Sequence, residues 1–277
     1  MYSIAVGGII LEFEKKSRYE MDDLLHIMEI LRGPGGCPWD REQTHESIRG
    51  NLIEETYEAV EAIDRKDTAL LREELGDVLL QVVFHSRMEE EQGSFQFGDV
   101  VHDICQKLII RHPHIFGDVQ VSGTGEVLEN WEAIKNAVKG TKTQTERLRA
   151  VPSVYPALMR SQKVAGRAAK AGMDYPDTAG AWKDLESELG ELKEAVAEGN
   201  REHAEEELGD LLFAAVNVAR HEGIDSEYAL TRSCEKFIDR FEEAEKLSAE
   251  RGIDMKTADA ETLDALWKQA KKNVYSR

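Results

Sequence analysis

Hydrophobic positions recur at helical spacing along almost the whole chain, with polar residues between them. Only 6 prolines interrupt the chain, runs of β-branched residues are few, and long stretches are rich in Ala, Glu, Leu, Lys and Arg. These residue types favour helices, so the intrinsic preferences agree with the spacing. The pattern therefore predicts an all-α protein.

Two segments of the chain repeat each other closely. The sequence EELGDVLL at residues 73–80 returns as EELGDLLF at residues 206–213. The same offset of 133 residues relates the Glu-x-x-Glu pattern at 55–58 to the one at 188–191. Repetition of both the residues and their spacing indicates an internal duplication, and each copy is expected to form one helical unit.

The correspondence continues beyond these motifs, although its offset drifts to 129 and then 136. Changes in loop length produce such drifts. The matched pieces are KLIIR at 107–111 with KFIDR at 236–240, and Trp131 and Lys135 with Trp267 and Lys271. Each copy thus ends in a segment that carries a tryptophan and a lysine.

A polar stretch separates the two copies. The sequence KGTKTQT at 139–145 is poor in apolar residues, and Pro152 and Pro156 interrupt helical continuation. We expect an extension of unknown structure at residues 1–20, an N-terminal domain at 21–138, a linker at 139–156 and a C-terminal domain at 157–277. Within the extension, the apolar run is too short for a membrane span and lacks the flanks of a secretory signal.

The net charge of the chain argues against one class of binding partner. It carries 54 acidic and 35 basic residues, a net charge of −19, which argues against binding nucleic acid through a basic face. Acid excess also keeps a protein soluble, so by itself it does not define a function. The 3 cysteines are scattered without the spacing of a disulfide framework or a zinc site. We therefore expect a cytoplasmic protein that binds neither nucleic acid nor membranes.

Carboxylates gather on one face of each predicted motif helix. Residues three or four apart share a helix face, so Glu55 lies with Glu58, and Glu74 lies with Asp77 on the next helix. The short connection between the helices makes them antiparallel neighbours, which brings both patches together. Converging carboxylates repel one another, whereas hard oxygen ligands suit Mg²⁺. The pattern predicts a divalent-cation site, and the duplication predicts a second one.

Basic residues recur in the later part of each copy. Lys107 and Arg111, one helical turn apart, can present an ammonium and a guanidinium to phosphate oxygens. A single surface pair would usually be solvated, but its recurrence as Lys236 and Arg240 favours a role in phosphate binding. The recurring tryptophans either stack on a nucleobase or pack in a core, and the sequence leaves both interpretations open.

The duplicated pattern of Glu-Glu-x-x-Glu followed by Glu-x-x-Asp resembles the MazG family of nucleoside triphosphate pyrophosphohydrolases over nearly everything after residue 20. GCPWDREQTH at 36–45 and RHPHIFG at 111–117 also look like stretches typical of bacterial members. The resemblance implies an all-α fold in which paired helices of two subunits form bundles, and a Mg²⁺ cofactor with Mn²⁺ as the alternative. It implies hydrolysis of nucleoside triphosphates to a monophosphate and pyrophosphate by attack of water at the α-phosphorus.

The resemblance also implies roles for individual residues. The metal ligands would be Glu55, Glu58, Glu74 and Asp77 in the first copy, and Glu188, Glu191, Glu207 and Asp210 in the second. Glu54 and Glu73 would line the first site and Glu206 the second, as candidates for taking the proton from water. The substrate contacts would be Lys107, Arg111, Trp131 and Lys135, or Ser187, Lys236, Arg240, Trp267 and Lys271. Ser187 stands where the first copy has Glu54, so which copy is active is left open.

Two other interpretations are weaker. A di-iron bundle needs a Glu-x-x-His motif on each of two helices, and this pattern at Glu42 and His45 has no partner in the repeat. A non-catalytic helical protein that binds partners or metal through acidic faces is the alternative to an enzyme. The recurrence of the acids at one constant offset speaks against it.

Overall fold

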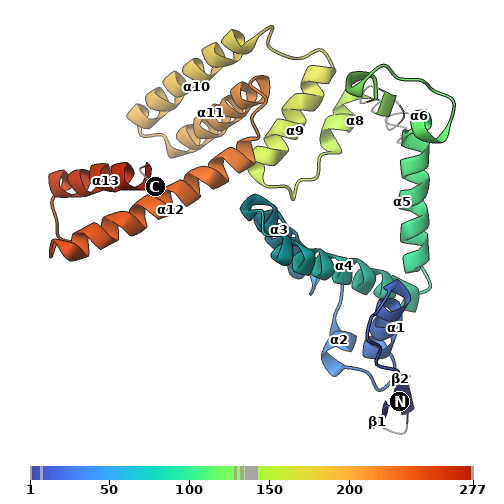
Figure 1. Ribbon diagram of the computed structural model, residues 1–277. Helices are drawn as coiled ribbons and strands as arrows, with labels where there is room; N and C mark the ends of the chain where they lie inside the picture. The colour runs from blue at the N-terminus through green and yellow to red at the C-terminus, as the bar shows by residue number, and fades with distance from the viewer. Residues whose placement is uncertain (1, 7–8, 128–129, 132–133, 135–142, 276–277) are drawn as a thin grey trace. The chain divides into compact units, whose positions relative to one another are not determined.

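The computed structural model describes residues 2–6, 9–127, 130–131, 134 and 143–275 (Figure 1). The chain divides into two compact units, Met1–Val138 and Lys139–Arg277. Helices build both units, which confirms the all-α prediction. The β structure of the described residues is one antiparallel hairpin of β1 (Tyr2–Val6) and β2 (Ile9–Phe13), in the N-terminal extension.

After the hairpin, the helices of the first unit follow one another through short connections. Those described from end to end are α1 (Met21–Arg32), α2 (Pro38–Glu42), α3 (Arg49–Arg65), α4 (Thr68–Glu91), α5 (Phe97–Arg111) and α6 (Pro113–Phe116). The core lies where α1 meets α4, and its buried side chains are Met28, Ile48, Val83, Phe84 and Met88. This core supports the C-terminal half of α4, whereas α3 packs along its N-terminal half.

The turn between α3 and α4 is only two residues long. Lys66 adopts the left-handed conformation at φ 56°, which ends α3. The side chain of Asp67 then accepts hydrogen bonds from the backbone N–H groups of Ala69 and Leu70, at 3.0 and 3.1 Å, and so caps α4. Because the chain reverses within these two residues, α3 and α4 pack as antiparallel neighbours, as predicted.

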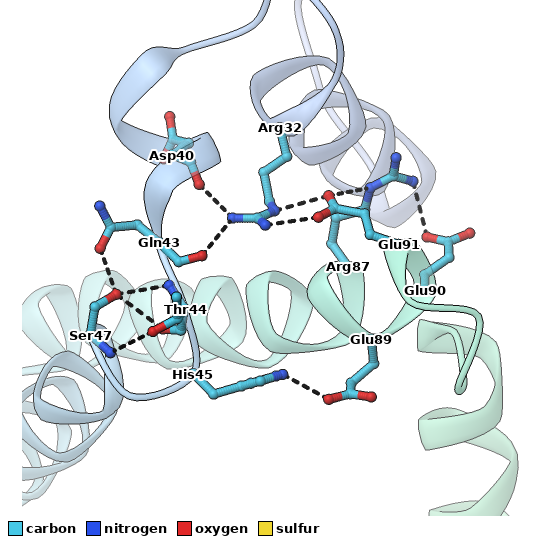
Figure 2. Close-up of polar contacts among 10 residues, drawn as sticks. All are labelled: Arg32, Asp40, Gln43, Thr44, His45, Ser47, Arg87, Glu89, Glu90 and Glu91. Carbon is cyan, nitrogen blue, oxygen red and sulfur yellow. Dashed lines mark hydrogen bonds and ion pairs between the residues drawn. The ribbon is translucent and has the colours of Figure 1, made fainter.

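A polar network ties the segment after α1 to the C-terminal end of α4, as Figure 2 shows. The Arg32 side chain is only 7% exposed and pairs with Glu91, at 2.8 Å from Nη2 to Oε2 and 2.9 Å from Nε to Oε1. Its Nη1 donates to the backbone carbonyls of Asp40 and Gln43, at 2.5 and 3.3 Å. Each of the three nitrogens of this nearly buried guanidinium thus has an oxygen partner. These contacts hold the α2 segment against α4.

The second unit contains one helix pair in its middle and another at its C-terminal end. Its helices are α8 (Gln144–Arg149), α9 (Ala157–Lys170), α10 (Thr178–Glu198), α11 (Arg201–His221), α12 (Ser226–Glu250) and α13 (Ala260–Tyr275). The two pairs are α10 with α11 and α12 with α13. The expected linker, residues 139–156, includes α8, and its residues 139–142 lie outside the described part. Arg167 of α9 donates to the carbonyl of Arg147, and Val151 is buried, so α8 packs against α9.

The turn between α10 and α11 uses the same device as the one between α3 and α4. Gly199 is left-handed at φ 72°, and Asn200 accepts a hydrogen bond from the backbone N–H of His203 at 3.3 Å. Gly199 and Asn200 correspond to Lys66 and Asp67 by the offset of the repeat. The α10–α11 pair is therefore the second copy of the α3–α4 pair.

Candidate functional site

Carboxylates from both helices of the first pair converge. One carboxylate oxygen from each of Glu55 and Glu58 on α3 and Glu74 on α4 lies within 4.8 Å of the other two. Glu74 is only 8% exposed, so neighbouring residues cover most of its surface. This group, Glu55, Glu58 and Glu74, is the first acid cluster. Three of the four acids predicted to bind metal in this copy therefore meet, while Asp77 lies outside this close group.

The acids of the first cluster perturb one another. Burial raises the pKa of Glu55, and the negative charges of Asp77 and Glu58 raise it further. Burial also raises the pKa of Glu74, with the charges of Glu58 and Asp77 adding to the effect. Asp77 is thus close enough to act on both carboxyls. A group of acids that resist ionisation in one another's presence could hold a divalent cation, which would relieve the repulsion.

A second acid cluster forms at the corresponding place in the second unit. Glu188 on α10 and Glu207 and Asp210 on α11 each place one carboxylate oxygen within 4.8 Å of the others. Glu207 is 9% exposed, like its counterpart Glu74. Burial, followed by the charges of Glu191 and Asp184, raises the pKa of Glu188. This cluster, Glu188, Glu207 and Asp210, could also hold a divalent cation.

The two clusters do not recruit the same set of acids. In the second copy, the Ser187 hydroxyl donates a 2.9 Å hydrogen bond to Oε1 of Glu191, which lies outside the close group. In the first copy, the counterpart of Glu191 is Glu58, which belongs to the close group. The substitution of Ser187 for a glutamate therefore changes the surroundings of a neighbouring predicted ligand.

The second cluster also has polar neighbours that the motif did not reveal. His203 lies one turn before Glu207, and its Nε2 is 3.1 Å from Oε1 of that residue. The Tyr175 hydroxyl donates a 2.6 Å hydrogen bond to Asp184, one turn before Glu188. By the 133-residue offset, Leu70 and Asn51 stand where the second copy has His203 and Asp184. A comparison of the two copies by residue type could have identified both differences.

The remaining predicted acids and the predicted basic residues are spread over other parts of each unit. Glu54, Glu73 and Glu206 are exposed on the paired helices, beside the clusters in sequence. Lys107 on α5 and Lys236 on α12 are exposed. Lys135 lies outside the described residues. Within the described residues, no hydrogen bond or ion pair joins the predicted phosphate-binding residues Lys107, Arg111, Lys236, Arg240 and Lys271 to either cluster.

The two tryptophans have different surroundings. The guanidinium of Arg111 lies over the ring of Trp131, 4.9 Å from its centroid. In the second unit, Trp267 instead packs against Phe237, with ring centroids 4.9 Å apart, beside the core between α12 and α13. The half-buried Trp267 therefore serves at least in packing, one of the two roles that the sequence left open.

A family model of the MazG nucleotide pyrophosphohydrolase domain matches the chain twice, at residues 43–116 and 180–244. Each match contains one helix pair and one acid cluster. The chain belongs to this family. The resemblance seen in the sequence and the prediction of two copies are thereby confirmed.

Two relatives within the family match almost the full length, and a third matches part of it. A nucleoside triphosphate pyrophosphohydrolase of Escherichia coli (strain K12) is 44% identical over 91% of this chain and 97% of the relative. The nucleoside triphosphate pyrophosphohydrolase/pyrophosphatase MazG of Thermotoga maritima is 44% identical over 93% of this chain and 98% of the relative. A nucleoside triphosphate pyrophosphohydrolase of Mycobacterium tuberculosis is 39% identical over 61% of this chain and 51% of its own length. Like other members of the family, this chain is an enzyme of the pyrophosphohydrolase class.

Proposed function

We propose that this protein hydrolyses nucleoside triphosphates to a nucleoside monophosphate and pyrophosphate, and that the reaction requires Mg²⁺, which Mn²⁺ can replace. The observation that carries the proposal is the convergence of three carboxylates in each of the two matched domains. The names of the full-length relatives supply the substrate class. Acid clusters on helix pairs would otherwise be a costly feature in a protein that bound no cation.

The chemistry of the donors fits a hard divalent cation. The residues that would hold it are Glu55, Glu58, Glu74 and Asp77 in the first copy, and Glu188, Glu191, Glu207 and Asp210 in the second. All of them offer carboxylate oxygens, which Mg²⁺ and Mn²⁺ prefer over nitrogen or sulfur ligands. When bound, the cation would neutralise phosphate charge and lower the pKa of the attacking water.

The protein's own groups would orient the substrate and accept a proton. Lys107 and Arg111, or Lys236 and Arg240, are the residues we assign to the phosphates, because ammonium and guanidinium groups donate to phosphate oxygens. An exposed glutamate beside each cluster, Glu54 or Glu73 in the first copy and Glu206 in the second, would take the proton as water attacks the α-phosphorus. Pyrophosphate would then be the leaving group.

We also propose that the protein is a homodimer. Apolar side chains are exposed on the helices that carry the acids: Tyr57 of α3 is 53% exposed and Leu212 of α11 is 50% exposed. Others on the same helices are Ile53, Val60, Ile63, Leu75, Leu189, Val196 and Leu208. Exposed apolar residues that recur along paired helices favour an interface that buries them. A second copy of each helix pair would bury them and complete a bundle. Light scattering would then give twice the mass of one chain, and a monomer at micromolar concentration would exclude the dimer.

Two properties of the chain support a cytoplasmic enzyme with small-molecule substrates. The net charge of −19 disfavours contact with nucleic acid backbones, and the cysteines Cys37, Cys105 and Cys234 are free, as expected in a reducing compartment. In the described residues, no helix combines the length and the apolar character that a membrane crossing needs. A gel-shift assay with duplex DNA and with RNA, expected to show no complex, checks the first point.

The function is tested by incubating the purified protein with each common nucleoside triphosphate, with Mg²⁺, with Mn²⁺ or with EDTA. We expect a monophosphate and pyrophosphate in equal amounts, and loss of turnover in EDTA. In water labelled with heavy oxygen, attack at the α-phosphorus places the label in the monophosphate. Release of orthophosphate, label in pyrophosphate, or unchanged turnover in EDTA would each contradict the proposal.

A further inference from the structure

Tyr275, the last residue of α13, holds the side chain of Arg240 on α12. Nη2 of Arg240 donates a 2.5 Å hydrogen bond to the Tyr275 hydroxyl oxygen, and the guanidinium carbon lies 5.0 Å from the centroid of the ring. The two residues are 35 positions apart, so this contact spans two helices. Nε of Arg240 is buried without a hydrogen-bond partner in the described residues. Tyr275 thus supplies both a hydrogen-bond acceptor and a ring face to this guanidinium.

The first copy arranges the corresponding arginine differently. Arg111 lies over Trp131, and the repeat would lead one to expect Arg240 over Trp267. In the second unit, however, the ring of Trp267 packs against Phe237, and a different ring takes its place beside the arginine. A tyrosine hydroxyl can accept a hydrogen bond, whereas an indole N–H can only donate. The second copy thus holds its arginine by a ring face and an acceptor together.

The surroundings of Tyr275 suit an anion. Its side chain lines a surface hollow with Lys268, Lys271 and Lys272, and Lys271 is one of the residues assigned to the phosphates. Lys268 also forms an ion pair with Asp264, whereas Lys271 has no ion pair within the described residues. Within the described residues, Nη1 of Arg240 has no hydrogen-bond partner, so it can donate to a phosphate oxygen.

We propose that Tyr275 is a positioning residue that fixes Arg240 for binding the triphosphate group in the second copy. This proposal rests on the function proposed above. An arginine side chain held by a ring and a hydroxyl loses less conformational freedom when it binds phosphate than a mobile one does. Tyr275 therefore acts on substrate affinity through Arg240 and has no contact with the reacting atoms in the chemical step.

The test uses the full chain carrying Asp77→Ala, so that the second cluster is the intact one. Tyr275→Phe keeps the ring and removes the acceptor, and Tyr275→Ala removes both. Loss of one hydrogen bond to a charged group should raise KM for the nucleoside triphosphate about tenfold in the first variant, and more in the second, with kcat nearly unchanged. The matched control is Tyr228→Phe, because Arg232 lies over the Tyr228 ring at 5.7 Å elsewhere on α12. This control should leave KM unchanged.

A double-mutant cycle separates positioning from a general structural effect. If Tyr275 acts through Arg240, Tyr275→Phe should have no further effect on KM in a chain that already carries Arg240→Ala. An effect that persists there, or an unchanged KM in Tyr275→Phe, would overturn the proposal. If the Asp77→Ala chain has no turnover, calorimetric titration with inorganic triphosphate and Mg²⁺ replaces KM in the same cycle. Wild-type protein that fails to release pyrophosphate would contradict the proposed function, whereas normal turnover with unaltered affinity in the variants would contradict only the role of Tyr275.

Discussion

The Ser187 hydroxyl donates a hydrogen bond to Glu191, and this contact distinguishes the second acid cluster from the first. The first copy has Glu54 at the position of Ser187, and Glu58, which corresponds to Glu191, lies within the close group of carboxylates. In the second copy, Glu191 lies outside the close group formed by Glu188, Glu207 and Asp210. One substitution has therefore altered which acids a cation would meet first.

We predict that Ser187→Ala strengthens cation binding in the second copy. Without the hydroxyl, Glu191 loses a competing partner and can turn toward Glu188. Because a hydrogen bond to a charged group is worth about 1.5–3 kcal/mol, an increase in Mg²⁺ affinity of about tenfold is expected. Calorimetric titration of Mg²⁺ into the Asp77→Ala chain, with and without the serine change, measures it. Weaker binding would mean that the serine holds Glu191 in a ligating position.

Removal of one acid from each cluster should show which copy catalyses the reaction. Asp77→Ala and Asp210→Ala each take away a carboxylate without removing a core side chain. We expect the variant of the active copy to lose at least about 100-fold in kcat/KM, and the double variant to be inactive, because the cation loses a ligand. The control is Glu61→Gln, which removes an exposed charge of α3 that pairs with Arg65. Full activity in the double variant would exclude both clusters as the site.

The stability of the first unit should depend on the protonation of His85. Nδ1 of His85 lies 2.7 Å from Nδ1 of His45, and the two ring planes differ by only 4°. Only one proton fits between two nitrogens at that distance. Burial, and then the charge of His45, holds the pKa of His85 below its usual 6.5. Below that value the unfolded chain binds more protons than the folded one, so the free energy of unfolding falls as the pH falls.

The measurement is a urea unfolding series from about pH 7.5 to about pH 5.5, which spans the ordinary titration range of histidine. The wild-type midpoint should fall more steeply with acidification than that of His85→Gln, which cannot gain a proton. His203→Gln is the control, because this histidine lies in the other unit and its side chain is 42% exposed. Parallel slopes in the wild-type protein and His85→Gln would contradict the prediction.

Arg32 should be a strong contributor to the stability of the first unit. Arg32→Met keeps an apolar stem of similar length but removes the pair with Glu91 and the bonds to two backbone carbonyls. We expect the free energy of unfolding to fall by about 2–3 kcal/mol, because hydrogen bonds of a nearly buried cation are lost. Lys246→Met, which breaks an exposed pair with Glu242, should change it by about 0–1 kcal/mol. Equal effects in calorimetric unfolding would contradict the role given to Arg32.

The sequence by itself determined the helical class, the duplication and the helices that carry the acids. Spacing of three or four residues places side chains on one helix face wherever a helix forms, and this rule needs no knowledge of neighbours. Asp67 and Asn200 act in the same local way, because each caps a helix directly after a left-handed residue. A few adjacent residues therefore determine the chain reversal that brings each helix pair together.

Only the tertiary structure decided which of these side chains meet. Carboxylate positions depend on side-chain rotamers, and a neighbour such as Ser187 changes them without changing the motif. His45 and His85 are 40 positions apart, and their contact exists only because the α2 segment is held against α4. The exchange of Trp267 for Tyr275 beside Arg240 likewise follows from how α13 packs on α12. Helix periodicity acts over a few residues, whereas these contacts come from packing between segments that the sequence does not place together.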